Sequence, residues 1–247
     1  MHIDLCSREE ILDEMASALG GGVPLAIASA NLDHLHHFAA GGLDLPPDQT
    51  VDGVRWRTLL DGVPLLRAVE RTARRPVELH TGSELLPEAL RLGAEVGARV
   101  VLVGGGPVLR ERWPAALAEQ YPGLVDAGTR EVAWAWLDRA GSGEQLARWV
   151  ADRRADVVVV SLGKPRQERW LRDHGARTGG RLLLAVGSAP EYVAGTAYRA
   201  PDWARRHGLE WAVRLAREPR RLWRRYLLDD ARVWLGLRRR LRTTPPA

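Results

Sequence analysis

Apolar and polar residues alternate along the chain in two distinct patterns. Continuous apolar runs lie at 24–30, 99–105, 156–162 and 181–187, as expected for strands that are covered on both faces. Between them, apolar residues recur at helical spacing in 32–39, 63–74, 83–96, 108–120, 142–153 and 165–176. This alternation predicts βαβ units, and therefore an α/β fold with a Rossmann-like, mostly parallel sheet and helices on both faces.

The two ends of the chain add helices to this pattern. Ser7 and Glu10 have the spacing of a capping box, which predicts that a helix begins there. Beyond residue 199 no apolar run has the character of a strand, and Leu, Trp and Val recur at helical spacing between arginines in 201–242. We therefore divide the chain into an α/β domain at 1–198 and an Arg- and Trp-rich helical appendage at 199–247.

Charge is distributed unevenly between these two parts. The chain has a net charge of +5, yet residues 199–242 contain 14 arginines and 5 acidic residues, which leaves the α/β domain acidic. Helices rich in Arg and Trp suit a membrane surface, which is the first interpretation. The same arginines could bind a substrate diphosphate as well. Nucleic acid ranks third and is not an expected partner, and a solvated, packed helix pair is the simplest alternative.

Composition limits the other kinds of site. A single cysteine, Cys6, rules out an internal disulfide and a cysteine metal cage. The imidazoles of His34, His36 and His37 follow i, i+2, i+3 spacing, which does not gather them around one ion, and the sequence contains no D-x-D motif. We therefore expect no metal. The sequence contains no run of about 18 apolar residues, so we expect no membrane-spanning helix.

Three predicted strand ends carry residues suited to ligand binding, which in open α/β sheets occurs beyond the carboxyl ends of the strands. Ser29 and Asn31 follow the first run. Glycines 104–106 and Pro107 follow the second and open a helix, an arrangement that binds phosphate or simply makes a tight turn. The stretch SLGKPRQE (161–168) follows the third. Its Gln and Glu could hold sugar hydroxyls, or the Glu could complement the helix dipole.

Several longer motifs resemble one known family. They are LGKPRQERW (162–170), AVGSAPEYVAGTAYRAPDW (185–203) and GLEWAVRLAREPRRLWRRY (208–226), together with SANLDHL (29–35), LVGGGP (102–107) and TGSELLP (81–87). Taken together they resemble the WecG/TagA/CpsF family of bacterial glycosyltransferases, glycosyltransferase family 26. The lack of G-x-G-x-x-G disfavours a dinucleotide enzyme.

The resemblance implies a specific reaction. Members transfer a sugar, commonly N-acetylmannosamine or a relative, from a UDP-sugar to a polyprenyl-diphosphate-linked saccharide, with inversion and without a metal or other cofactor. The products are exopolysaccharides, other cell-surface polysaccharides or wall polymers. The resemblance further implies a cytoplasmic protein, peripheral on the inner membrane surface, whose appendage closes over the site. A homo-oligomer is compatible with it. The alternative is a non-catalytic UDP-sugar or lipid-binding relative.

The resemblance also implies which residues form the site. Asp61 is expected to be the base and Gln167 a second catalytic residue. The residues expected to bind substrate are Ser29, Asn31, Gly104, Gly105, Gly106, Gly163, Lys164, Glu168, Glu191, Arg199, Arg214, Arg221 and Arg224. The chain departs from the family pattern where Leu79 replaces an Arg, Glu191 an Asp and Pro190 an aromatic residue.

Two Asp-Gly pairs compete for the position of the base. Asp61 lies 21 residues before Gly82, as in the family, and is followed by VPLL, which resembles the family's helix entry. Asp52 lies 30 residues before Gly82. We therefore assign the base to Asp61 and a turn to Asp52, which remains the alternative base. The stretch between Asn31 and Asp61 is longer than in the family, which predicts an insertion near the site.

Overall fold

The fold is described by a computed structural model. It covers residues 2–38, 45–46, 48–198, 200–201, 204 and 209–243, and the side chains of all of these except 210, 221 and 238–243.

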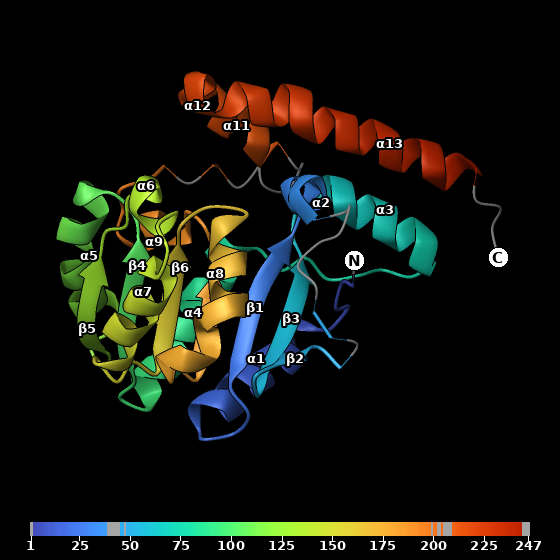
Figure 1. The fold of residues 1–247 in the computed structure, drawn as a ribbon. Coiled ribbons are helices and arrows are strands. Elements are labelled where there is room, and N and C mark those ends of the chain that lie inside the picture. Colours follow the sequence, from blue (N-terminus) through green and yellow to red (C-terminus); the bar gives the residue numbers. More distant parts are fainter. Residues whose placement is uncertain are drawn as a thin grey trace.

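A seven-stranded sheet forms the centre of the molecule (Figure 1). Its strand order is β2-β3-β1-β7-β6-β4-β5, and every neighbouring pair is parallel except β2 and β3. The strands are β1 (Leu25–Ala30), β2 (Thr50–Val51), β3 (Val54–Leu60), β4 (Arg99–Gly104), β5 (Val125–Arg130), β6 (Val157–Ser161) and β7 (Leu182–Ala185). Six parallel strands place their carboxyl ends at one edge of the sheet, as the predicted Rossmann-like fold requires.

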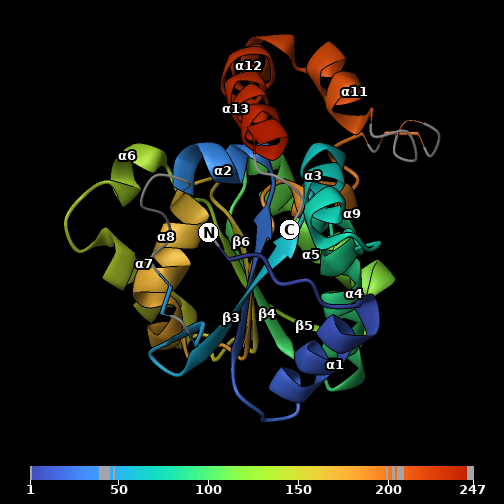
Figure 2. The same ribbon diagram turned by 90° about the vertical axis from the view of Figure 1, so that its right-hand side faces the viewer.

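Helices cover both faces of the sheet (Figure 2). One face packs against α1 (Arg8–Leu19), α4 (Gly82–Glu95), α5 (Pro107–Gln120) and α9 (Ala189–Val193), and the other against α7 (Ser142–Ala151) and α8 (Arg166–His174). Successive residues of a strand serve opposite faces. Leu25 and Ile27 therefore join the first core and Ala26 and Ala28 the second. Burial on both faces explains why these strands are continuously apolar.

Three remaining helices follow the carboxyl ends of strands: α2 (Leu32–Phe38), α3 (Val63–Ala73) and α6 (Trp134–Leu137). The 3₁₀ turn η1 (Gly175–Thr178) connects α8 to β7. At the start of α1, Ser7 accepts a hydrogen bond from the Glu10 amide, and Glu10 in turn accepts one from the Ser7 amide. The predicted capping box is confirmed.

The four predicted strands and six predicted helices are all present, but three strands were not predicted. β3 alternates buried and exposed residues at its start, so Arg55 and Arg57 interrupt its apolar pattern. β5 is an edge strand without a buried residue, and β2 has only two residues. Neither β5 nor β2 has a continuous apolar run, the pattern by which four of the other strands were predicted.

The hairpin between β2 and β3 fixes the position of Asp52. Asp52 and Gly53 form its two-residue loop, with φ of 48° and 81°, and Val51 pairs with Val54. Positive φ at both central residues is the backbone that Asp-Gly favours. The loop lies at the amino end of β3, about 20 Å from its carboxyl end at ~3.3 Å per residue. The prediction of an insertion near the site is therefore wrong for this hairpin, and residues 39–44 of the same stretch lie outside the described residues.

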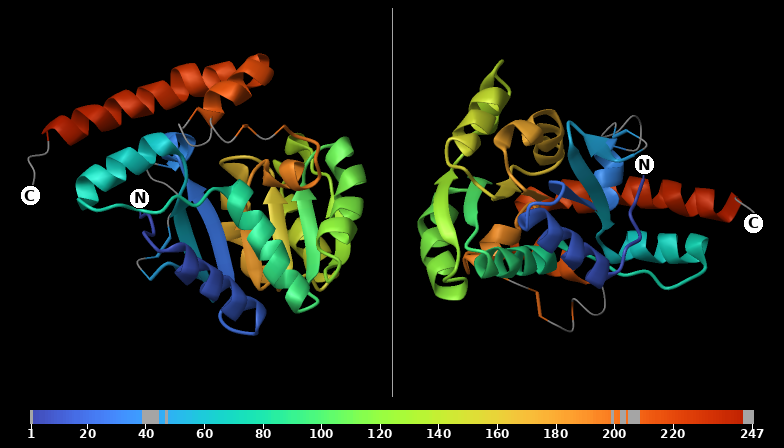
Figure 3. Two further views of the ribbon diagram at one scale, coloured as in Figure 1. Left: turned by 180° about the vertical axis from the view of Figure 1, so that it is seen from behind. Right: turned by 90° about the horizontal axis from the view of Figure 1, so that it is seen from below.

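The C-terminal helices lie across the carboxyl edge of the sheet (Figures 1 and 3). They are α11 (Glu210–Arg217), α12 (Pro219–Arg224), a π-helical segment η2 (Arg225–Asp229) and α13 (Asp230–Thr243). Leu222 is buried, and Leu237 packs against the apolar cluster around Leu60 and Leu65. In the part of the chain that is described, no helix is both long enough and apolar enough to cross a membrane.

Candidate active site

A cavity of about 1350 Å³ lies between the carboxyl edge of the sheet and the C-terminal helices. The loops that follow β1, β3, β4, β6 and β7 form its floor, and α11, η2 and α13 contribute its opposite wall. Residues more than 100 positions apart in sequence therefore meet here. The cavity is large enough for a ligand larger than a single sugar, since typical small-molecule sites span about 300–1,000 Å³.

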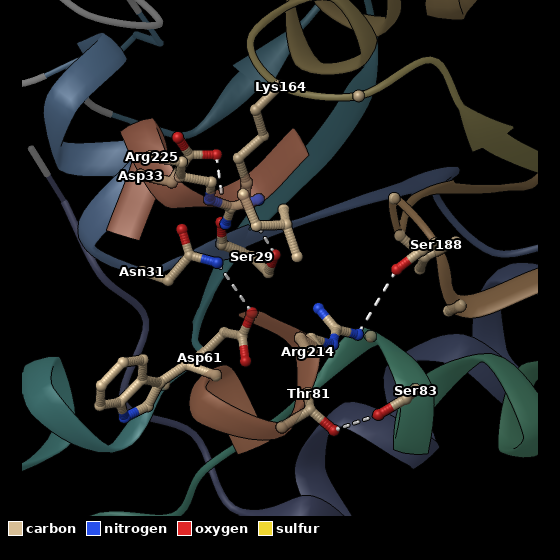
Figure 4. Close-up of a pocket in the computed structure, with 18 of the residues that line it drawn as sticks. Ser29, Asn31, Asp33, Asp61, Thr81, Ser83, Lys164, Ser188, Arg214 and Arg225 are labelled. Atoms are coloured by element: carbon tan, nitrogen blue, oxygen red, sulfur yellow. Dashed lines mark hydrogen bonds and ion pairs between the residues drawn. The ribbon is translucent and has the colours of Figure 1, made fainter. Parts of the chain in front are cut away.

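Asp61 and Asn31 face each other across the ends of two neighbouring strands (Figure 4). Asn31 donates from Nδ2 to Asp61 Oδ2 at 3.0 Å, while its Oδ1 accepts from the His34 amide at 3.0 Å at the start of α2. Because the amide oxygen is engaged by a backbone donor, the NH₂ group must point toward Asp61. The Asp61 carboxylate is thus held by one oxygen, and both residues line the cavity.

The backbone after Asp61 requires glycine. Gly62 has φ of 91° and precedes Val63 and Pro64, the first residues of α3. Such a φ is available to glycine at little cost. A Cβ there would make only an ordinary contact, 3.5 Å from the Asn31 Cβ, so the backbone conformation is what requires glycine. The Asp-Gly pair at 61–62 therefore turns the chain from strand to helix while directing the carboxylate into the cavity.

The glycines after β4 have separate tasks. A Cβ on Gly104, whose φ is 97°, would lie 2.3 Å from the Ser161 carbonyl oxygen, so this residue permits the close approach of β4 and β6. Gly105 and Gly106 line the cavity, and Gly106 is the N-cap of the 14-residue helix α5. Free amides and the positive end of the helix dipole at that place favour an anion.

Lys164 reaches from the loop after β6 to the end of β1. Its Nζ donates to the Ser29 carbonyl oxygen at 2.5 Å and to Ser29 Oγ at 3.0 Å, and lies 3.6 Å from Glu168 Oε1. Gln167 donates from Nε2 to the same Glu168 oxygen at 3.0 Å. The peptide between Lys164 and Pro165 is cis, and α8 begins at Arg166. Together these bonds join the ends of β6 and β1 beneath the cavity.

Burial alters the protonation of two groups in this region. Glu168 is fully buried, which raises the pKa of its carboxyl, although the Lys164 ammonium acts in the opposite direction. Burial, assisted by the charge of Lys164, lowers the pKa of His34 to about 3. His34 is therefore a neutral imidazole, and it packs against Phe38 with ring centroids 4.5 Å apart. No metal role is needed to explain it.

The C-terminal helices bring cations to the opposite wall. Arg225 Nη2 lies 3.3 Å from Asp33 Oδ2 on α2, and Arg214 donates to Ser188 Oγ at 3.4 Å and to the Tyr192 hydroxyl. Arg217 stacks on Tyr198 at 3.6 Å. All three arginines line the cavity. Arginine is suited to phosphate because its guanidinium forms two parallel hydrogen bonds.

The sequence did not identify Arg225 or Arg217 as site residues, and it selected Arg224, the neighbour of Arg225. Arg224 is exposed and is not among the residues that line the cavity, whereas Arg225 is. A π-helical segment begins at Arg225. The binding role of Arg224 stays a prediction. Asp33, the ion-pair partner of Arg225, occupies the acidic position of the SANLDHL motif.

The other predicted site residues fall into four groups. Those that line the cavity are Ser29, Asn31, Asp61, Gly105, Gly106, Gly163, Lys164, Gln167, Glu191 and Arg214. Gly104 and Glu168 are buried behind the lining. Arg199 and the side chain of Arg221 lie outside the described residues. Asp52, the alternative base, is on the distant hairpin.

Leu79 is one of the positions where the chain departs from the family pattern. Leu79 lines the cavity and packs against the cluster around Leu60, and its neighbour His80 is buried, with Nε2 2.9 Å from the Cys6 carbonyl oxygen.

The described residues include no group of three or more His, Cys, Asp or Glu side chains arranged to hold a metal ion. Independence from metals stays a prediction.

The arrangement combines a carboxylate, an anion-binding helix start and several arginines in one cavity. These are the parts needed to remove a proton from one ligand while stabilising a negative charge on another. Comparison with known proteins agrees with this chemistry. A family model described as "Glycosyl transferase WecG/TagA/CpsF family" matches residues 1–246, nearly the whole chain.

Proposed function

The chain belongs to the WecG/TagA/CpsF family of glycosyl transferases, and from that premise we propose a specific reaction for it. The enzyme transfers an N-acetylmannosamine-like sugar from a UDP-sugar to a polyprenyl-diphosphate-linked saccharide, with inversion at the anomeric carbon and without a metal. Its product belongs to a cell-surface polysaccharide or wall polymer.

The observation that carries this proposal is the pair of Asp61 and Asn31 at the carboxyl edge. An inverting transfer needs one base that accepts the proton of the attacking hydroxyl. Asp61 supplies a carboxylate at the cavity wall, and the hydrogen bond from Asn31 to Oδ2 leaves Oδ1 available to that hydroxyl. The acceptor oxygen then bonds to the anomeric carbon on the face opposite the departing UDP, whose bond to the sugar breaks with both electrons.

The departing UDP must be stabilised by positive charge. The start of α5 at Gly106 and the arginines of α11 and η2 face the same cavity. Helix amides and guanidinium groups are preorganised donors, which act on charge as it develops in the transition state. We assign the diphosphate to the side of the cavity between Gly106 and Arg214.

A lipid-linked acceptor accounts for the surface of the C-terminal helices. Trp223, Leu228 and Leu235 are exposed to 48%, 37% and 55%, beside the arginines of this part of the chain. Apolar side chains flanked by arginines favour an anionic membrane interface. We propose that this surface holds the enzyme against the cytoplasmic face of the cell membrane and that it works without forming a complex with nucleic acid.

A UDP-release assay tests the reaction. Purified protein in EDTA is supplied with UDP-N-acetylmannosamine, UDP-N-acetylglucosamine or UDP-glucose, together with a short polyprenyl-diphosphate-linked saccharide. We expect release of UDP that depends on the acceptor and proceeds in EDTA, and NMR of the product should give the inverted anomer. Release that requires Mg²⁺ would contradict metal independence, and silence with every donor would contradict the transferase.

Leu79 supports a second candidate, a UDP-sugar or lipid-binding protein without turnover. It places an apolar side chain in the cavity where the family has an arginine. Such a protein would bind UDP in calorimetry yet release none from UDP-sugars, and replacement of Asp61 would change nothing beyond binding.

A further inference from the structure

Lys164 is exceptional in this chain. Of its 36 basic residues, 35 are arginine and Lys164 is the single lysine. It lies in the cavity, yet only 8% of its side chain is exposed. A composition so strongly biased toward arginine directs attention to what a lysine provides at this one position.

The partners of Lys164 explain why an ammonium suits the position. Three oxygen atoms surround the one nitrogen: the Ser29 carbonyl at 2.5 Å, Ser29 Oγ at 3.0 Å and Glu168 Oε1 at 3.6 Å. An ammonium has three donors on a single atom, whereas a guanidinium spreads five donors over a planar fork. Partners that converge on one point therefore favour lysine.

These partners also hold the ammonium of Lys164 in place. Nζ donates two hydrogen bonds to Ser29 on β1 and lies within ion-pair distance of Glu168 on α8. Because β7 lies between β1 and β6 in the sheet, the bonds to Ser29 link the ends of two strands that are not neighbours. In Figure 4 it points toward Ser29, on the side of the cavity where Asn31 faces Asp61. Lys164 is thus arranged to hold other residues rather than to bind substrate through its own charge.

The consequence falls on Ser29. A serine hydroxyl has one hydrogen and can accept from other donors. Because Lys164 donates to Ser29 Oγ, the hydroxyl hydrogen remains for the cavity, which Ser29 lines. Ser29 then presents a fixed donor two residues from Asn31, whose own NH₂ group is directed to Asp61.

We propose that Lys164 is a positioning residue: it fixes Ser29 as a hydrogen-bond donor to the sugar of the bound nucleotide-sugar and so sets how that sugar is seated beside Asp61. The inference rests on the proposed function, which supplies the nucleotide-sugar. The group recognised is an acceptor oxygen of the sugar, either a hydroxyl or an acyl carbonyl. Because the ammonium is held by protein oxygens, it leaves the diphosphate to the arginines of the opposite wall.

Binding measurements with matched variants test this role. Calorimetry would compare UDP with UDP-N-acetylmannosamine for the unaltered protein, Lys164→Met and Ser29→Ala. We expect each substitution to weaken the UDP-sugar about tenfold, as for one hydrogen bond of ~1 kcal/mol or slightly more, and to change UDP affinity less than twofold. The double variant Lys164→Met with Ser29→Ala should bind the UDP-sugar no more weakly than either single variant, because both substitutions remove the same contact.

Three controls keep the result interpretable. Lys164→Met leaves the buried Glu168 carboxylate without its cation, so Lys164→Met with Glu168→Gln is the companion that removes both charges. Arg177→Met removes an exposed cation from an ion pair with Glu144 outside the cavity, and it should leave both affinities unchanged. Selective ¹⁵N labelling of lysine gives one Nζ signal, which Ser29→Ala should shift if the contact exists in solution.

The outcomes separate this inference from the proposed function. An equal loss of UDP and UDP-sugar affinity in Lys164→Met would overturn it, since the ammonium would then act on the nucleotide part. Additive losses from Ser29→Ala and Lys164→Met would overturn it as well. A protein that binds the UDP-sugar in the expected way but never transfers it would contradict the transferase and leave the role of Lys164 intact.

Discussion

At the scale of single residues, the two Asp-Gly pairs show how one dipeptide takes two roles. Both glycines have positive φ, 81° at Gly53 and 91° at Gly62. What differs is position: the first pair closes a hairpin at the amino end of β3, and the second leaves its carboxyl end. In a parallel sheet only the carboxyl end faces the ligand. Location in the topology therefore distinguishes the proposed base from a turn.

Replacing each aspartate by asparagine tests that distinction. Asp61→Asn should lower kcat by about 10²–10⁴, the usual contribution of a general base, while UDP affinity stays near that of the unaltered protein. Asp52→Asn should keep full activity, since its loop is remote from the cavity. UDP release and calorimetry measure the two quantities. Full activity of Asp61→Asn, or loss of activity in Asp52→Asn, would contradict the assignment.

Asp230 provides a prediction about pH. It is 8% exposed at the start of α13, and burial raises the pKa of its carboxyl to about 6 from 3.8. Asp33 and Asp229 raise the pKa further, whereas Arg225 and His36 lower it. The folded state thus binds this proton more tightly than the unfolded state. The resulting stabilisation is complete below 3.8 and is lost as pH rises through about 6.

Asp230→Asn cannot ionise, so it should retain stability that the unaltered protein loses. Between about pH 5 and about pH 7.5, the Tm of Asp230→Asn should fall less than the Tm of the unaltered protein. His34, whose pKa is lowered to about 3, affects both proteins equally and cancels in the comparison. Differential scanning calorimetry gives the two values. Parallel Tm profiles for the two proteins would refute the assigned burial of this carboxyl.

At the scale of elements, the C-terminal helices contact the α/β domain through apolar packing and through polar side chains. Leu222 and Leu237 provide apolar packing, and the Arg225–Asp33 ion pair joins η2 to α2. The neighbouring Arg224 is exposed and does not line the cavity. Adjacent arginines with such different surroundings form a natural matched pair for experiment.

Substituting that pair tests how the helices are docked. Arg225→Gln leaves Asp33 without its guanidinium partner, so α11, η2 and α13 should exchange amide hydrogens several-fold faster. Activity should fall with them, because the arginines of this wall would no longer be in place. Arg224→Gln should leave the exchange unchanged. Hydrogen-exchange mass spectrometry decides, and equal protection in both variants would show that the ion pair does not hold the helices.

The elements also show what the sequence could and could not predict. Continuous burial explains why β1, β4, β6 and β7 were found, and helical spacing why the six surrounding helices were. β3 was missed because Arg55 and Arg57 serve its partly exposed face, and β5 because an edge strand buries little. Asn31 and Lys164 were selected because they follow predicted strands, and Asp61 because its spacing from Gly82 resembles that of the family. Arg225 was not selected, because residue type alone does not tell which of the adjacent arginines 224 and 225 faces the cavity.

At the scale of the whole molecule, the cavity lies between two parts of the chain that contribute different chemical groups to it. The carboxyl edge of the sheet supplies the carboxylate, the glycine loop and the polar groups around Ser29, and the C-terminal helices supply arginines. In the proposed reaction, a saccharide on a membrane lipid reaches Asp61 from outside the sheet. The proposal therefore requires the carboxyl edge to face the membrane, which the helices that lie across this edge would meet first (Figure 1).

Vesicle binding tests this orientation. The unaltered protein should sediment with vesicles that contain phosphatidylglycerol, less with pure phosphatidylcholine, and less at high salt, because arginine–headgroup attraction is screened. Trp223→Ser with Leu235→Ser removes two exposed apolar side chains outside the cavity lining. It should weaken binding at least about tenfold, since burying one such side chain contributes ~1.5–3 kcal/mol. UDP affinity should not change.

The matched control lies at the opposite end of the sheet. Val96 and Val125 are exposed to 58% and 43%. Val96 follows α4 and precedes β4, and Val125 is the first residue of β5. Val96→Ser with Val125→Ser should bind vesicles as the unaltered protein does, because the proposed orientation directs this end away from the membrane. If both double variants lost binding equally, attachment would be a general effect of exposed apolar surface. If neither did, the C-terminal helices would serve the cavity alone and the acceptor would have to reach Asp61 without them at the membrane.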